Sequence, residues 1–172
     1  MVDMTLFHPR FKERNKNRPI LLYVGPILKS RNIKEFLDIP IEGLKRVIGE
    51  GRYRHELSRR YPYVEFISPL DDIQLARAYS QADVFVYPHI GYRLEKYIVE
   101  ALACGLPVAG YPTALMSKVV DGPDVGSVGT SLSCAIHDTL MWHDTPVLIA
   151  SRVRRARALN PHIGMLVRSI VD

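Results

Sequence analysis

The 172-residue sequence contains little cysteine and no long apolar run. Its two cysteines, Cys104 and Cys134, form neither a C-x-x-C pair nor a disulfide framework, which favours a reducing cytoplasm. No apolar stretch approaches the roughly 20 residues that span a bilayer, so we expect no transmembrane segment. The first residues lack an apolar segment after a basic head, unlike a secretory signal. These absences favour a cytoplasmic globular protein.

Basic residues outnumber acidic ones, and the formal net charge is +5. The excess is concentrated in residues 12–18, 52–60 and 152–157. The last stretch has four arginines that a helix would spread over more than one face. This favours a solvated helix, and the alternative is contact with anionic lipid or a phosphate-bearing partner, which would place the protein peripherally at a membrane. No zinc-finger spacing or aromatic RNA-binding motif is present, so we expect no nucleic-acid partner.

Short apolar runs alternate with helical segments from residue 19 onward. Five runs are typical of buried strands: 20–25, 44–49, 64–68, 83–88 and 106–112. Amphipathic or polar stretches of helical spacing follow the first four runs. This alternation predicts an α/β fold with a doubly wound, Rossmann-like parallel sheet in one domain over residues 19–172. Residues 1–18 are expected to form a linker-like segment.

Glycine turns follow the first two predicted strands. Gly25 ends the first run, and Gly49 and Gly51 flank Glu50 after the second. Ligands of doubly wound sheets bind at the carboxyl ends of strands, where backbone N–H groups can face a phosphate. A tight turn with positive φ explains these glycines equally well. No GxGxxG follows the first run, which argues against a dinucleotide-dependent oxidoreductase.

Four segments follow one another in a specific order: YVGPILKSRNIKEFL, VIGEGRYRHELSRRYPYVEF, LARAYSQADVFVYP and VEALACGLPVAGYP. The series resembles the C-terminal, nucleotide-sugar-binding domain of GT-B glycosyltransferases of group 1, and it is most similar to their α-mannosyltransferase-like branch. The resemblance covers residues 2–142. It implies the donor-nucleotide-binding domain of a retaining glycosyltransferase, which transfers a hexose from a GDP- or UDP-linked sugar.

The resemblance also assigns roles to particular residues. Glu100 matches the glutamate that opens the motif EALACG and binds the donor ribose, for which a carboxylate can accept hydrogen bonds from both hydroxyls. Gly25, Gly49 and Gly51 match the glycine turns of the family. Arg31 stands in place of a lysine and keeps a cation for the diphosphate, although guanidinium and ammonium differ in geometry.

Several positions depart from the family pattern. Pro26 replaces an arginine that holds the diphosphate, and proline has no N–H to donate. Tyr92 replaces the acid that contacts the donor sugar. Glu95 replaces a glycine beside the diphosphate, so its charge would repel phosphate unless it points away. His89 is the candidate for a new donor-binding group, and a partly exposed structural histidine is the alternative.

Two functions therefore remain open. The first is the donor-binding half of a glycosyltransferase, incomplete alone because the N-terminal acceptor domain is expected to be absent. Its uncovered face would bind a separate acceptor-binding domain or a second copy of the chain. The second is a degenerate, non-catalytic domain that acts as a binding or interaction module. No residue is assigned as catalytic, and the six histidines show no ligand spacing, so we expect neither a metal nor a cofactor.

Overall fold

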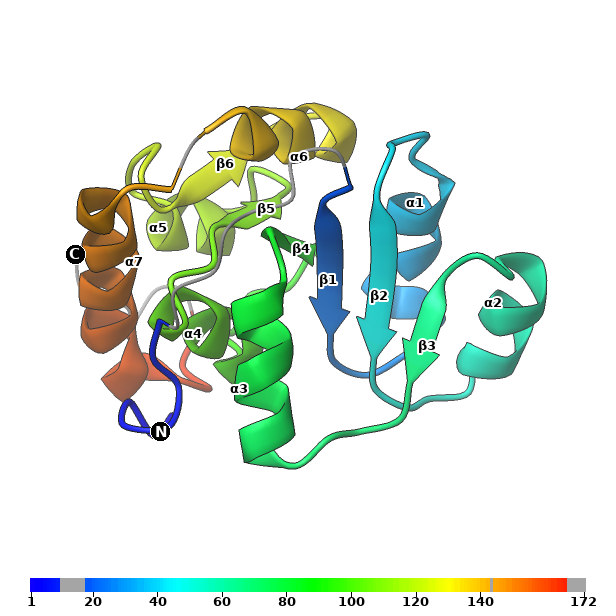
Figure 1. Cartoon of the computed structure of the whole chain (residues 1–172), viewed down its shortest axis with the longest axis horizontal. Coiled ribbons are helices and arrows are strands. Elements are labelled where there is room, and N and C mark those ends of the chain that lie inside the picture. The colour runs from blue at the N-terminus through cyan, green and yellow to red at the C-terminus, as the bar shows by residue number, and fades with distance from the viewer. Residues whose placement is uncertain (10–17, 143, 167–172) are drawn as a thin grey trace.

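The strands form one sheet in which every neighbouring pair is parallel (Figure 1). A computed structural model describes residues 1–9, 18–142 and 144–166. Within this part of the chain the strand order is β3-β2-β1-β4-β5-β6. The strands are β1 (Ile20–Val24), β2 (Leu44–Ile48), β3 (Glu65–Ile67), β4 (Val84–Tyr87), β5 (Val108–Gly110) and β6 (Gly126–Val128). This order is that of doubly wound Rossmann folds, which confirms the predicted fold class.

Helices cover both faces of the sheet. They are α1 (Ile33–Asp38), α2 (Arg54–Arg60), α3 (Asp72–Gln81), α4 (Lys96–Ala103), α5 (Ala114–Val119), α6 (Leu132–Met141) and α7 (Pro146–Leu159), with short 3-10 turns η1 (Lys29–Arg31) and η2 (Asn160–His162). Helices α3, α4, α5 and α7 pack on one face with Phe85 and Val108. Helices α1, α2 and α6 pack on the other face with Val84 and Val86. Successive residues of β4 thus enter opposite cores, as in a strand that is buried on both sides.

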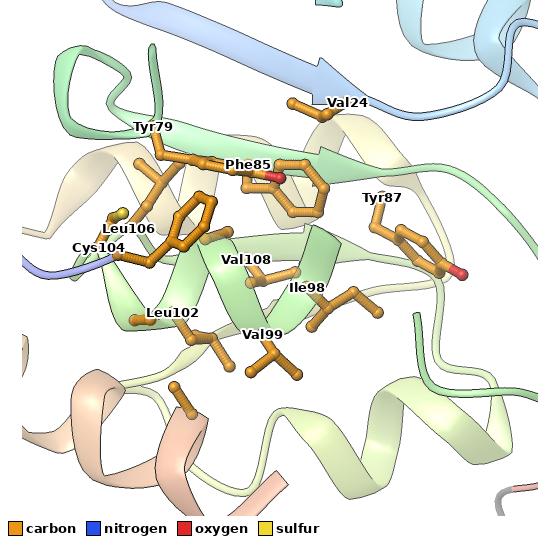
Figure 2. Packing of buried hydrophobic residues seen from close by; sticks show 14 of the residues in the cluster. Val24, Tyr79, Phe85, Tyr87, Ile98, Val99, Leu102, Cys104, Leu106 and Val108 are labelled. Atoms are coloured by element: carbon orange, nitrogen blue, oxygen red, sulfur yellow. The ribbon is translucent and has the colours of Figure 1, made fainter. Parts of the chain in front are cut away.

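The larger core is centred on α4 (Figure 2). Ile98 and Leu102 of this helix are completely buried and belong to the same cluster as Phe85 of β4. An aromatic series continues along this face, because the ring of Phe85 lies 5.9 Å from Tyr79 and 6.5 Å from Tyr87. Tyr87 is the last residue of β4, so the series leads from the core to the edge of the sheet where parallel strands end.

The sequence patterns predict five strands correctly but miss β6. Its three residues, Gly126–Val128, contain no apolar run. The strand is defined by its parallel pairing with β5, which spans Val108–Gly110. A strand of this kind depends on its neighbour rather than on its own composition, and periodicity therefore gives no signal for it.

The chain start packs against the end of the last long helix. Val2 and Phe7 are buried, and the backbone N–H of Val2 donates to the Asn160 side chain at 2.7 Å. Asn160 returns a hydrogen bond to the carbonyl of Val2 at 2.9 Å. Residues 10–17 of the predicted linker-like segment, which spans 1–18, lie outside the described residues.

The arginines of α7 have two different environments. Arg152 is completely buried and donates to the backbone carbonyls of Asp124 and Gly105 at 2.8 and 2.9 Å. Arg155 pairs with Asp121 at 3.2 Å. Both arginines thus bind within the protein, and the prediction of a wholly solvated basic helix is wrong for them because their acceptors come from distant segments. Each helix in the described ranges is too short or too polar to cross a membrane.

Candidate functional site

A cavity of about 270 Å³ lies at the carboxyl ends of β1, β2 and β3. Its walls are the turn at Gly25, the turn at Gly49, the segment after β3 at Leu70, and the first turn of α4 with Lys96 and Tyr97. In a parallel doubly wound sheet ligands bind at the carboxyl ends of the strands, in the crevice where the strand order reverses, which in this sheet lies between β1 and β4. The cavity therefore defines the candidate site.

Close backbone contact dominates the glycine turns. Gly25, Gly49 and Gly51 all have positive φ, at 147°, 150° and 156°. A Cβ on Gly49 would lie only 2.0 Å from the carbonyl oxygen of Gly25, and one on Gly51 would lie 2.2 Å from another backbone oxygen. The N–H groups of Gly25 and Gly49 donate to the carbonyls of Ile48 and Ile67, each at 3.0 Å. Two of the three predicted phosphate-facing glycines thus already use their N–H groups within the fold.

Glu100 lies behind the cavity wall rather than in the cavity itself. Its carboxylate is 2% exposed and accepts a hydrogen bond from the Tyr79 hydroxyl at 2.9 Å. Lys96 Nζ lies 3.3 Å from its other oxygen and is half exposed at the cavity. Burial raises the pKa of Glu100, while the charge of Lys96 and the hydrogen bond from Tyr79 act against this increase. Lys96 thus separates the predicted ribose-binding acid from the cavity.

Arg31 is paired with Glu95. The guanidinium Nη1 lies 2.6 Å from Glu95 Oε1, and the Tyr87 hydroxyl donates to Glu95 Oε2 at 3.1 Å. Burial acts to lower the pKa of Arg31, but the hydrogen bond and charge of Glu95 outweigh it and raise that pKa above its usual value. Glu95 therefore points toward the cation that the sequence assigns to the diphosphate.

His89 lies next to this ion pair. Its Nδ1 is 3.2 Å from the carbonyl oxygen of Ser30, and its ring packs edge-on against Tyr87 at 5.9 Å. Burial and the neighbouring charge of Arg31 lower the pKa of His89, with Glu95 opposing them. Arg31, Tyr87, His89 and Glu95 thus form one polar cluster, and Glu95 directly precedes Lys96 of the cavity wall.

Three residues of the site were not predicted as ligand-binding groups. Lys96 is four positions before Glu100, and this helical spacing was a usable signal for an ion pair. Tyr79 and Tyr87 had no such signal, because tyrosines in apolar segments are usually core residues. Tyr92 is 68% exposed and makes none of the hydrogen bonds or ion pairs described above. In the described ranges no cluster of three or more metal-ligating side chains is present.

The sheet topology and the position of the cavity together define a Rossmann-like domain with a cavity at the carboxyl ends of its strands. The sequence matches the family described as glycosyl transferases group 1 over residues 18–131, and the chain belongs to this family. The family predicted from the four sequence segments is confirmed, whereas the α-mannosyltransferase-like branch stays a prediction.

The chain is similar to two characterised transferases. It is 27% identical over 143 residues to sulfoquinovosyl transferase SQD2 of Arabidopsis thaliana. This alignment covers 74% of this chain and 28% of that protein. It is 30% identical over 134 residues to a GDP-mannose-dependent alpha-mannosyltransferase of Mycolicibacterium smegmatis. This second alignment covers 70% of this chain and 36% of that protein. The chain therefore spans about a third of the length of these relatives.

The fold is also similar to that of a solved structure with bound UDP. The structure in question is Anabaena HepE in complex with UDP and glucose. The alignment covers 98% of this chain and 52% of the HepE chain, with a TM-score of 0.66. The sequence identity of 14% limits this likeness to the fold.

Proposed function

We propose that the chain is the donor-nucleotide-binding domain of a retaining glycosyltransferase that uses a nucleotide-diphosphate hexose. The observation that carries this proposal is the cavity at the carboxyl ends of β1 to β3, with Glu100 behind Lys96 on one wall and Arg31 on the same edge of the sheet. It is supported by family membership, by the GDP-mannose dependence of one relative and by UDP in a protein of the same fold. The donor is a GDP- or UDP-linked sugar.

Each predicted site residue has a role in this proposal. Glu100 accepts hydrogen bonds from the ribose hydroxyls once Lys96 moves from its present position. Arg31 binds the diphosphate, and His89 adds a hydrogen-bonding group beside it. The turns at Gly25, Gly49 and Gly51 shape the cavity wall by bringing two backbone segments into contact. No metal or cofactor is assigned.

Nucleotide titration tests the assignment. We expect calorimetry with GDP, UDP and their sugar conjugates to detect one preferred nucleotide. Changing Glu100→Gln should weaken its binding about tenfold, because the amide keeps an acceptor for Tyr79 but loses charge-assisted bonds to ribose. The exposed Glu65→Gln serves as the control and should leave affinity unchanged. A folded protein that binds no nucleotide of the panel would instead favour a non-catalytic interaction module.

The proposal also requires an acceptor-binding surface from elsewhere. Four apolar side chains are exposed on neighbouring segments near the site: Ile90, Tyr92, Met165 and Leu166. These segments are joined by hydrogen bonds from the N–H of Leu94 to Met165 and from that of Gly164 to Leu94, at 3.2 and 2.7 Å. Exposed apolar groups of this kind favour a separate acceptor-binding domain or self-association at this face.

We further propose a cytoplasmic location with peripheral attachment to anionic membranes through α7. A groove of about 550 Å³ combines apolar side chains, among them Ile149 and Val153, with the exposed Arg154 and Arg157. Val147 at the start of the same helix is 72% exposed. Apolar groups next to cations match the interface of a membrane that contains acidic lipids.

Vesicle sedimentation tests this attachment. We expect binding to phosphatidylglycerol-containing vesicles and little binding to pure phosphatidylcholine. The double change Arg154→Gln and Arg157→Gln should weaken binding roughly 30-fold, since each arginine near an anionic surface contributes about 1 kcal/mol. The matched control, Arg59→Gln with Arg60→Gln, removes the same charge from α2 on the far side of the sheet (Figure 1). Equal losses for both pairs would contradict a specific role of α7.

A further inference from the structure

Two adjacent residues at the start of α4 pair with the two charged groups that the proposed function gives to the nucleotide. Glu95 lies 2.6 Å from Arg31, the proposed diphosphate ligand. Lys96 lies 3.3 Å from Glu100, the proposed ribose ligand. Both charges of the site are therefore compensated by the protein's own side chains.

The pair of Glu95 with Arg31 is more enclosed than a surface ion pair of this protein. Its side chains are 22% and 18% exposed, compared with 57% and 77% for the surface pair of Glu56 with Lys29. Both carboxylate oxygens of Glu95 accept a hydrogen bond, one from Arg31 and the other from Tyr87. A phosphate oxygen has the same charge sign and the same preference for such donors, so it competes for the same groups.

The position of the Glu95 side chain has no local explanation in the helix. Glu95 is the residue that precedes α4, where a side chain can accept a hydrogen bond from the first free N–H groups. It makes no such bond. Its carboxylate is directed instead to Arg31 on η1, which is 64 positions earlier in the sequence.

We infer that Glu95 is an internal anion that occupies Arg31 and thereby decides which ligands the site accepts. A diphosphate reaches Arg31 only by displacing Glu95 from it, whereas an uncharged nucleoside binds without this competition. The inference rests on the proposed function for the nucleoside part of the ligand. The competition for Arg31 itself concerns any diphosphate, including inorganic pyrophosphate.

Removal of this carboxylate tests the inference. We expect Glu95→Ala to bind pyrophosphate, UDP and GDP about tenfold tighter or more than the unchanged protein, because Arg31 and Tyr87 become available to phosphate oxygens. Affinity for uridine and guanosine should stay the same. Calorimetric titration of the whole chain measures all five ligands.

Glu65→Ala is the matched control. Glu65 also pairs with an arginine, Arg46, at 2.6 Å, but it is the first residue of β3 and lies at the opposite end of this strand from the cavity. This variant should bind every ligand as the unchanged protein does. If thermal denaturation shows that Glu95→Ala is unfolded, Glu95→Gln replaces it, because the amide keeps hydrogen-bonding atoms and removes only the charge.

The outcomes separate this inference from the proposed function. Unchanged pyrophosphate affinity in the folded Glu95 variant overturns the inference, whether or not nucleosides bind. Nucleoside binding without that gain leaves the proposed function standing alone. Tighter pyrophosphate binding supports the inference, and if nucleosides fail to bind in every variant, the nucleotide assignment is wrong while the competition at Arg31 holds.

Discussion

Changing Gly49→Ala is expected to lower the free energy of unfolding by more than about 4 kcal/mol, enough to unfold a marginally stable domain. The new Cβ would lie 2.0 Å from the carbonyl oxygen of Gly25, and a backbone atom cannot move aside as a flexible side chain can. Movement is further opposed because the N–H groups of both glycines donate to strand carbonyls. Chemical denaturation followed by circular dichroism measures the change.

Gly164→Ala is the control for backbone conformation alone. Gly164 has a positive φ of 84°, but a Cβ added there meets no heavy atom within 4 Å among the described residues. Its cost should be only about 1 to 2 kcal/mol, the usual penalty of a left-handed residue. Equal losses of unfolding free energy for the two changes would show that the close contact between the turns after β1 and β2 is not the cause of the loss at Gly49.

The second large effect is expected at Arg152. Changing Arg152→Met should cost about 3 to 5 kcal/mol of unfolding free energy, because one partner is removed from a buried charged network. The completely buried guanidinium joins the carbonyl of Gly105, the carbonyl of Asp124 and the carboxylate of Asp144. These acceptors come from three separate segments, so the loss affects the packing of α7 on the rest of the domain.

Arg154→Met provides the comparison within the same helix. Arg154 is exposed at the surface groove, and its replacement should change stability by less than about 0.5 kcal/mol. Urea denaturation of both variants under the same conditions gives the difference directly. A small loss for Arg152→Met would mean that its three acceptors find other partners without it.

The strand predictions succeeded where local composition carries the signal. The run at 20–25 contains β1, and the run at 83–88 contains β4, because strands buried on both faces need consecutive apolar residues. β6 gave no such signal, since its residues Gly126–Val128 are held by pairing with β5. Sequence patterns thus predicted the central strands and the edge strand β3, and they missed the other edge strand, β6.

The structure gives the predicted site residues partners that the sequence analysis did not name, and their role in ligand binding stays a prediction. Glu100, Arg31 and His89 lie at the predicted edge of the sheet, yet each is engaged by a residue that the sequence did not connect with it. Glu100 is covered by Lys96, and Arg31 is held by Glu95. The sequence showed that Glu95 is unusual, but it could not show whether this carboxylate faces the ligand position or turns toward a cation.

By itself the sequence determined the α/β alternation, the glycine turns and the family, because these depend on residue types at short spacing. Only the tertiary structure decided which charges neutralise one another. Glu95 and Arg31 are 64 positions apart, and Arg152 reaches acceptors 28 and 47 positions away. Such contacts depend on how the helices pack on the sheet and where each long side chain points, and neither is encoded in local periodicity.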